Sequence, residues 1–343
     1  MTVPVLVCDD SSVARKQMAQ RLPEDWDIEV SFAQNGEEAV AAVEAGLAEI
    51  TFLDLNMPVM DGYQALEAIL EKNLQTITIV VSGDIQPEAE ARVKKLGAIG
   101  FLKKPFNGNE LIEFLQNYGL YQPAANTEDR PKTVESSKKA LPIIENIQFT
   151  DCIQEVCNVA MGQAGDSLAR LLNVFVKLPV PSVNMLEVSE LQMALSLSLE
   201  NSTYSAVCQG FIGSGVAGEA LLIFDDSSFA DMATLLNYKG ELSHAVELEL
   251  LMDVASILTG AFLNGFASQL DMQFSQGHPV VLGQHVYVPD LLQANASHWH
   301  KMLAIEVTYE IENYHITCDL LLLITGDSMD ILNERLSFLG DGS

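Results

Sequence analysis

The chain has 343 residues, enough for two ordinary domains, and its 48% hydrophobic and 19% charged residues are typical of globular proteins rather than disordered or fibrous ones. Its formal net charge is −29 at pH 7, and residues 151–343 carry 24 Asp and Glu against 5 Lys and Arg. Such a surface repels nucleic-acid phosphates and anionic lipids, which argues against direct DNA binding. The chain also lacks an apolar run of about 18 residues, so we expect a cytoplasmic protein without membrane insertion.

Short apolar runs alternate with amphipathic segments from Val3 to about Tyr118. The runs predict strands at Val3–Val7, Ile28–Phe32, Ile50–Leu53, Ile77–Val81 and Gly100–Leu102. The segments predict helices at Ser12–Leu22, Gly36–Ala45, Gly62–Lys72, Pro87–Leu96 and Asn109–Tyr118. Five strands alternating with five helices predict an α/β fold with a doubly wound parallel sheet, whose site lies at the carboxyl ends of its strands.

The polar stretch from Gln122 to Ala140, with two prolines, paired serines and paired lysines, predicts an interdomain linker. We therefore expect one domain over residues 1–121, a linker over 122–140 and a second domain over 141–343.

The second domain contains an internal repeat. Asp151, Glu155, Asn158, Gly162 and Pro181 recur 98 residues later as Glu249, Asp253, Ser256, Gly260 and Pro279. Each copy, about 149–240 and 247–340, opens with a long amphipathic helix, continues with a two-strand apolar pattern and closes on a short helix. This arrangement predicts a pseudo-twofold α+β domain with helices on an antiparallel sheet.

Chemistry-bearing side chains follow the predicted parallel strands. Asp9 and Asp10 come after the first strand, Asp54 after the third, Ser82 after the fourth and Lys104 after the fifth. Three carboxylates at one sheet edge favour a divalent cation with oxygen ligands, most simply Mg²⁺. The metal would let Asp54 act as a nucleophile toward a phosphoryl group, which the Ser82 hydroxyl and the Lys104 charge would bind. The alternative makes the first two carboxylates a helix cap and the lysine a solvated side chain.

Residues 1–120 resemble a CheY-type receiver domain, which has a flavodoxin-like fold. The matching motifs are Asp9–Asp10–Ser11, Asp54–Leu55–Asn56–Met57–Pro58 with Asp61–Gly62, Ser82–Gly83 and Lys104–Pro105–Phe106. The resemblance implies phosphorylation of Asp54 by a histidine kinase, and a cis Lys104–Pro105 bond. It implies that Asp9, Asp10, Asp54 and the Asn56 carbonyl surround Mg²⁺. It also implies that Phe101 holds the switch-aromatic position, where tyrosine is frequent.

Glu155 and Asn158 lie three residues apart on a predicted helix, so both are expected on one outward face. Taken alone, the pair is compatible with an ordinary solvated helix surface. However, the pattern Asp151-x3-Glu155-x2-Asn158-x22-Pro181 resembles the signature of the CheC/CheX/FliY phosphatases over roughly residues 145–340. In that family the Glu pairs with the receiver's lysine, and the Asn carboxamide aligns a water for attack on the acyl phosphate.

The second copy departs from this signature, because Asp253 replaces Glu and Ser256 replaces Asn. We therefore expect a degenerate second site and one working site. Four histidines (His278, His285, His298 and His300) lie in a loop-rich stretch without metal-ligand spacing, and we expect them to be surface residues.

These observations predict a response regulator of a chemotaxis-like pathway that hydrolyses the aspartyl phosphate of phosphorylated CheY-like receivers in trans, or its own in cis. The alternative is a non-catalytic docking module that binds a CheD-like protein or another receiver. The sequence leaves open the cognate kinase, the substrate receiver, the oligomeric state and whether phosphorylation activates or inhibits the output.

Overall fold

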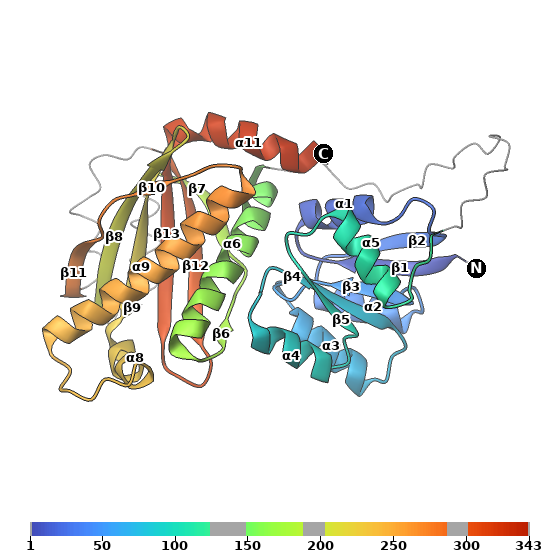
Figure 1. Cartoon of the computed structure of the whole chain (residues 1–343), viewed down its shortest axis with the longest axis horizontal. Coiled ribbons are helices and arrows are strands. Elements are labelled where there is room, and N and C mark those ends of the chain that lie inside the picture. Colours follow the sequence, from blue (N-terminus) through green and yellow to red (C-terminus); the bar gives the residue numbers. More distant parts are fainter. Residues whose placement is uncertain (1, 124–148, 188–202, 287–300, 342–343) are drawn as a thin grey trace. The chain divides into compact units, whose positions relative to one another are not determined.

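A computed structural model of the chain describes residues 2–123, 149–187, 203–286 and 301–341. These residues form two compact units, one built largely from the elements β1 to α5 and the other from α6 to α11 (Figure 1). Each unit is described by itself. No helix within the described ranges is long and apolar enough to cross a membrane.

The first unit is a parallel sheet with helices on both faces. Its strands are β1 (Val3–Cys8), β2 (Ile28–Ala33), β3 (Ile50–Leu53), β4 (Ile77–Ser82) and β5 (Gly100–Lys103), in the order β2-β1-β3-β4-β5. Its helices are α1 (Ser12–Arg21), α2 (Gly36–Glu44), α3 (Gly62–Glu71), α4 (Pro87–Lys95) and α5 (Gly108–Asn117). Separate apolar clusters pack on the two faces of the sheet. This architecture confirms the predicted parallel α/β fold, and each strand and helix ends within one residue of its predicted position.

Polar residues at the helix starts explain why the chain turns where it does. Ser11, Asn35, Asp61 and Asn107 are N-caps whose side chains accept hydrogen bonds from the first turn of α1, α2, α3 and α5. The caps of α3 and α5 form capping boxes, in which a Gln or Glu three residues later returns a bond to the cap backbone. These caps hold the helix starts next to the carboxyl ends of the strands.

The second unit is an antiparallel sheet covered by helices, as predicted. The strands are β6 (Val176–Lys177), β7 (Ser182–Glu187), β8 (Tyr204–Gly213), β9 (Val216–Asp225), β10 (Ser275–Gln276), β11 (Val280–Val286), β12 (Lys301–Ile311) and β13 (Thr317–Thr325). The helices are α6 (Phe149–Leu172), α8 (Phe229–Leu235), α9 (His244–Gln269) and α11 (Met329–Asp341), with short 3₁₀ turns η1 (Asp226–Ser228) and η3 (Gly326–Ser328) before α8 and α11. The long helices α6 and α9 lie side by side against the sheet (Figure 1).

The strand pairing shows how the two copies of the repeat interlock. The copies meet at the pair β9 and β13, and each contributes its shorter strands to the other: β7 pairs with β12, and β11 pairs with β8. The two halves therefore share one sheet and cannot bury their apolar faces separately.

The sequence analysis predicted two strands in each copy, which is fewer than the structure contains. Each copy also contributes a two-residue strand, β6 or β10, and an edge strand, β7 or β11. The short strands have no periodicity to detect, and β11 contains a glycine and has register shifts against β8. Edge strands with mixed polar and apolar residues lack the apolar runs that mark central strands.

Candidate functional site

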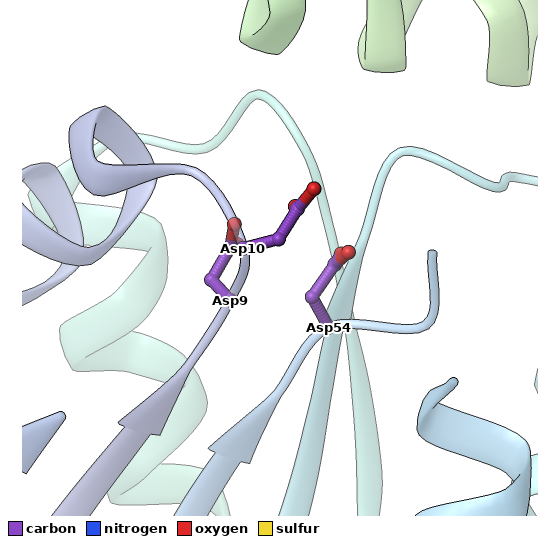
Figure 2. A group of neighbouring side chains, drawn as sticks. All are labelled: Asp9, Asp10 and Asp54. Carbon is purple, nitrogen blue, oxygen red and sulfur yellow. The ribbon is translucent and has the colours of Figure 1, made fainter. Parts of the chain in front are cut away.

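Three carboxylates gather at the carboxyl edge of the parallel sheet (Figure 2). Asp9 and Asp10 follow β1, and Asp54 follows the neighbouring strand β3. One oxygen from each of the three residues lies within 4.8 Å of the others, and Asp9 and Asp54 are buried. Three anions this close require a compensating positive charge.

Lys104 supplies part of that charge from the end of β5. Its Nζ lies 2.7 Å from Asp9 Oδ2 and 3.4 Å from Asp54 Oδ1. Only 8% of Lys104 is exposed, so the alternative in which it is a solvated side chain is wrong. The helix-cap alternative for the carboxylates is also wrong in its simple form, because Ser11 is the N-cap of α1.

Local backbone contacts position the carboxylates. Asp9 Oδ1 accepts a 2.9 Å hydrogen bond from the Ser11 backbone N–H, and Asp54 Oδ2 accepts a 3.0 Å bond from the Asn56 N–H. The Arg15 side chain donates to the Asp9 carbonyl at 2.5 Å. A Cβ at Gly62 would overlap the Asp54 carbonyl oxygen, so the start of α3 approaches the aspartate more closely than any side chain permits.

The remaining predicted residues lie on β4 and on the edge strand β5. Ser82 is the last residue of β4, is fully buried, and its carbonyl accepts a 2.9 Å bond from the Lys104 backbone N–H. Phe101 lies in β5, half-buried against the apolar cluster on one face of the sheet. The Lys104–Pro105 peptide is cis.

The residues of the cluster fit a hard divalent cation. Every donor is a carboxylate oxygen, which suits Mg²⁺, and the neighbouring thiol does not compete as a ligand. Burial, and secondly the charges of Asp9 and Asp54, raise the pKa of the Cys8 thiol far above its usual range, so it stays protonated. The site thus combines an oxygen-rich cation site with one lysine charge beside Asp54.

The second predicted site lies on α6. Glu155 and Asn158 are one turn apart, and neither carboxamide atom of Asn158 has a hydrogen-bond partner in the described ranges. Both residues lie on the long helix that the sequence analysis predicted for the first copy of the repeat.

The equivalent positions on α9 differ in chemistry and surroundings. Asp253 and Ser256 are exposed, and the Ser256 hydroxyl donates to the carbonyl of Met252 on its own helix at 2.8 Å. A hydroxyl used in this way is bonded locally rather than presented outward.

One polar network was missed by the sequence analysis. His285 Nδ1 lies 2.9 Å from Asp226 Oδ2, and its Nε2 lies 3.1 Å from Glu247 Oε2. The hydrogen bond to Asp226, more than the charge of Glu247, raises the His285 pKa. His285 is exposed, as expected of a surface histidine, but its pairing with acidic residues 38 and 59 positions away was not predicted. His298 and His300 lie outside the described residues.

The parallel sheet carries an oxygen-rich carboxylate cluster and an adjacent lysine at the carboxyl edge of its strands. The family of the response regulator receiver domain matches residues 5–116. The N-terminal unit is therefore the receiver domain of a two-component response regulator.

Several known proteins are similar to parts of this chain. A protein-glutamate methylesterase/protein-glutamine glutaminase from Moorella thermoacetica is 37% identical over 115 residues, 33% of this chain and 27% of that protein. The chemotaxis protein CheY4 of Vibrio cholerae is 32% identical, covers 34% of this chain and 98% of its own, and has a TM-score of 0.32. FliY of Thermotoga maritima is 16% identical over 59% of this chain and 100% of its own, with a TM-score of 0.43. The chain spans about a quarter of the length of the methylesterase that it matches.

Proposed function

We propose that Asp54 is the phosphorylated residue of this receiver domain, with a histidine kinase as the donor. The observation that supports this is the position of Lys104 between two of the three clustered carboxylates, 2.7 Å from Asp9 and 3.4 Å from Asp54. Asp9, Asp10, Asp54 and the Asn56 carbonyl would hold Mg²⁺, which supplies positive charge for the incoming phosphoryl group. Lys104 and the Ser82 hydroxyl would then bind phosphoryl oxygens.

We also propose that the second unit is a CheC-like phosphatase that removes such phosphoryl groups from receivers. The observation that carries this proposal is the Asn158 carboxamide, which has no hydrogen-bond partner in the described structure. An asparagine in mid-helix lowers helix propensity, so such a residue calls for a role other than stability. An amide that both donates and accepts can orient a water molecule.

The proposed reaction is hydrolysis of an acyl phosphate. Water attacks phosphorus in line, the P–O bond to the aspartyl oxygen breaks, and phosphate and the free carboxylate are released. Asn158 aligns the water, and Glu155 pairs with the lysine of the receiver. The second copy has Asp253 and Ser256 at these positions, so it would form a degenerate site. The chain would therefore have one working phosphatase site.

The docking-module alternative keeps the same surface without catalysis. A CheC-like unit of that kind would bind a CheD-like protein or another receiver in a phosphorylation-dependent way. The Asn158 carboxamide favours the enzyme, because docking alone does not require an amide at that position.

The methylesterase name of the relative suggests a different hydrolase, but the contacts of His285 and Ser205 do not fit one that uses these two residues. A serine hydrolase needs a histidine base bonded to the nucleophilic hydroxyl. In the described part of this unit, both ring nitrogens of His285 are bonded to carboxylates, and the Ser205 hydroxyl donates to Asp226 instead.

The test is phosphate release from phosphorylated receivers in the CheY-like class, measured under single-turnover conditions with the full chain. Asn158→Ala should slow release about 10²-fold, or about 3 kcal/mol of barrier, while receiver binding changes little. Ser256→Ala on α9 is the matched control. Wild-type turnover by Asn158→Ala on every receiver that it binds would reduce the unit to a docking module.

A further inference from the structure

The second unit contains a cavity of 840 Å³ on one face of its sheet. The register places Gly210 of β8 opposite Glu219 of β9, and Glu219 opposite Leu323 of β13, so these three residues form a row across the strands. Leu323 belongs to an apolar cluster whose buried members all come from strands: Leu221, Met302, Ala304, Leu321 and Leu323. The cavity therefore lies at one end of this strand-built apolar face. Its volume is typical of small-molecule sites.

The cavity has apolar walls and only negative charge. Ile212, Met302 and Leu323 line it, and Ile212 is 63% exposed at the rim. Its charged lining residues in the described ranges are Glu219 and Asp327, with no lysine, arginine or histidine. An exposed large apolar side chain beside a formed cavity is a common mark of a ligand site.

Glycines keep the cavity open without being required by packing. A Cβ at Gly210 would meet no atom within 4 Å, and a Cβ at Gly277 would meet only the Gly210 carbonyl, at 3.5 Å. By contrast, a Cβ at Gly218 would lie 2.5 Å from the Leu323 carbonyl, so that glycine is needed for strand packing. A glycine inside a strand weakens the strand, and it often marks close approach of a ligand.

Glu219 provides a fixed anion in the wall. Its Oε2 accepts a 3.5 Å hydrogen bond from the Cys208 thiol, and it has no cationic partner among the residues that the structure describes. Burial, and secondly the Glu219 charge, raise the pKa of Cys208 to about 12, so the thiol remains a proton donor. The Glu219 carboxylate thus has the Cys208 thiol as a hydrogen-bond donor, but no positive charge beside it among the described residues.

We propose that this cavity binds a small apolar molecule carrying one cationic group, an ammonium or a guanidinium. The apolar part packs against Ile212, Met302 and Leu323, and the cation lies beside Glu219. The charge of the region supports this choice, because residues 151–343 carry 24 acidic and 5 basic residues. The proposal does not depend on the phosphatase activity.

A matched pair of probes tests the proposal. We would titrate 4-phenylbutylammonium and 4-phenylbutyrate, which have similar shapes and opposite charges, into the full chain and follow binding by ligand-observed NMR. The ammonium should bind at least about tenfold more tightly, because the probes differ in the sign of a charge near a carboxylate in a partly dry site.

Two variants locate the binding. Gly210→Leu should fill the cavity and abolish binding of the ammonium, whereas Gly108→Leu, where an added Cβ also meets nothing within 4 Å, should not change it. Glu219→Gln should remove the preference for the ammonium, and Glu241→Gln on an exposed turn should leave it intact. Melting curves show whether each variant folds. Absence of saturable ammonium binding to the wild-type chain, equal affinity for both probes, or full binding by folded Gly210→Leu overturns the proposal.

Discussion

The two copies of the repeat in the second unit share a scaffold but differ in polar chemistry. Helices α6 and α9 occupy equivalent places, and their edge strands exchange symmetrically across one sheet. Yet α6 carries Glu155 and Asn158, whose carboxamide has no hydrogen-bond partner among the described residues. The serine at the equivalent position of α9 bonds to its own helix. Packing and strand pairing therefore preserve the repeat, and the Glu and Asn pair is not needed for that purpose.

The copies also differ in the polar contacts that join their long helices to the sheet. His285 of β11 links Glu247 near the start of α9 to Asp226 after β9. The residues 98 positions earlier are Glu187 and Phe149, which cannot form the equivalent pair. In the copy proposed to lack activity, a histidine thus bridges the long helix and the sheet, and the residues at the equivalent positions of the other copy cannot form that bridge.

The largest effect is expected on phosphorylation of the chain's own receiver domain. Asp54→Asn should abolish incorporation of phosphate from acetyl phosphate in the presence of Mg²⁺, because the amide is not a nucleophile for phosphoryl transfer. Phosphate-affinity electrophoresis measures the labelled fraction. Asp61→Asn is the matched control, since Asp61 is an N-cap and Asn serves equally well there. Labelling of Asp54→Asn at the wild-type level would show that the phosphoacceptor is elsewhere.

Glu155 and its counterpart in the second copy should differ in their contribution to receiver binding. If it pairs with the receiver lysine, Glu155→Ala should raise the half-saturating concentration of phospho-receiver about tenfold, or about 1.4 kcal/mol. The counterpart Asp253→Ala should not raise it. Initial rates over a range of receiver concentrations separate this effect from a change in the maximal rate. An unchanged half-saturating concentration in Glu155→Ala would contradict the pairing.

The bonds of His285 to Asp226 and Glu247 should make the stability of the second copy depend on pH. The pKa of His285 is raised in the folded state above its ordinary value of 6.5, so its contribution to stability is fully present below pH 6.5 and is lost as pH rises through the folded pKa. His285→Gln should therefore lower the melting temperature more at pH 5.5 than at pH 9. Because the histidine is 41% exposed, the difference should be small and should shrink with salt. An equal difference at both pH values would argue against a protonated bridge.

The smallest effect on the phosphatase rate is expected from substitutions on α9. Ser256→Ala removes a hydroxyl that is bonded within its own helix, and Asp253→Ala removes an exposed carboxylate. Neither should change the phosphatase rate by more than about twofold, since neither group can replace an amide that orients water. Single-turnover phosphate release is again the readout. A large loss with intact folding would mean that the second copy is active.

Much of the fold was predictable because its signals are local. Alternating apolar runs and amphipathic segments located the elements of the first unit. The carboxylate cluster followed from the rule that parallel strands end at one edge. The pairing of β7 with β12 was not predictable, because it joins segments more than 100 residues apart that lack strong periodicity. The same holds for the bonds of His285, which depend on tertiary neighbours.

The most direct test of the central claim uses two versions of the chain. Asn158→Ala, phosphorylated on Asp54 by acetyl phosphate and freed of donor, is the substrate. The catalyst is Asp54→Asn, which retains Asn158 but accepts no phosphate, and the control catalyst is the double variant Asp54→Asn/Asn158→Ala. Loss of the acyl phosphate is timed for each mixture and for the phosphorylated wild-type chain alone.

The account predicts one of two results. Either the Asp54→Asn catalyst accelerates phosphate loss from the substrate chain, or the wild-type chain loses its own phosphate faster than the Asn158→Ala chain does. The expected difference is about 10²-fold, and the double variant should be inactive. The first outcome indicates action in trans, and an acceleration independent of protein concentration indicates action in cis. If phosphate loss has the same rate in all of these samples, the second unit does not use Asn158 to hydrolyse the phosphate on this receiver, which contradicts the account.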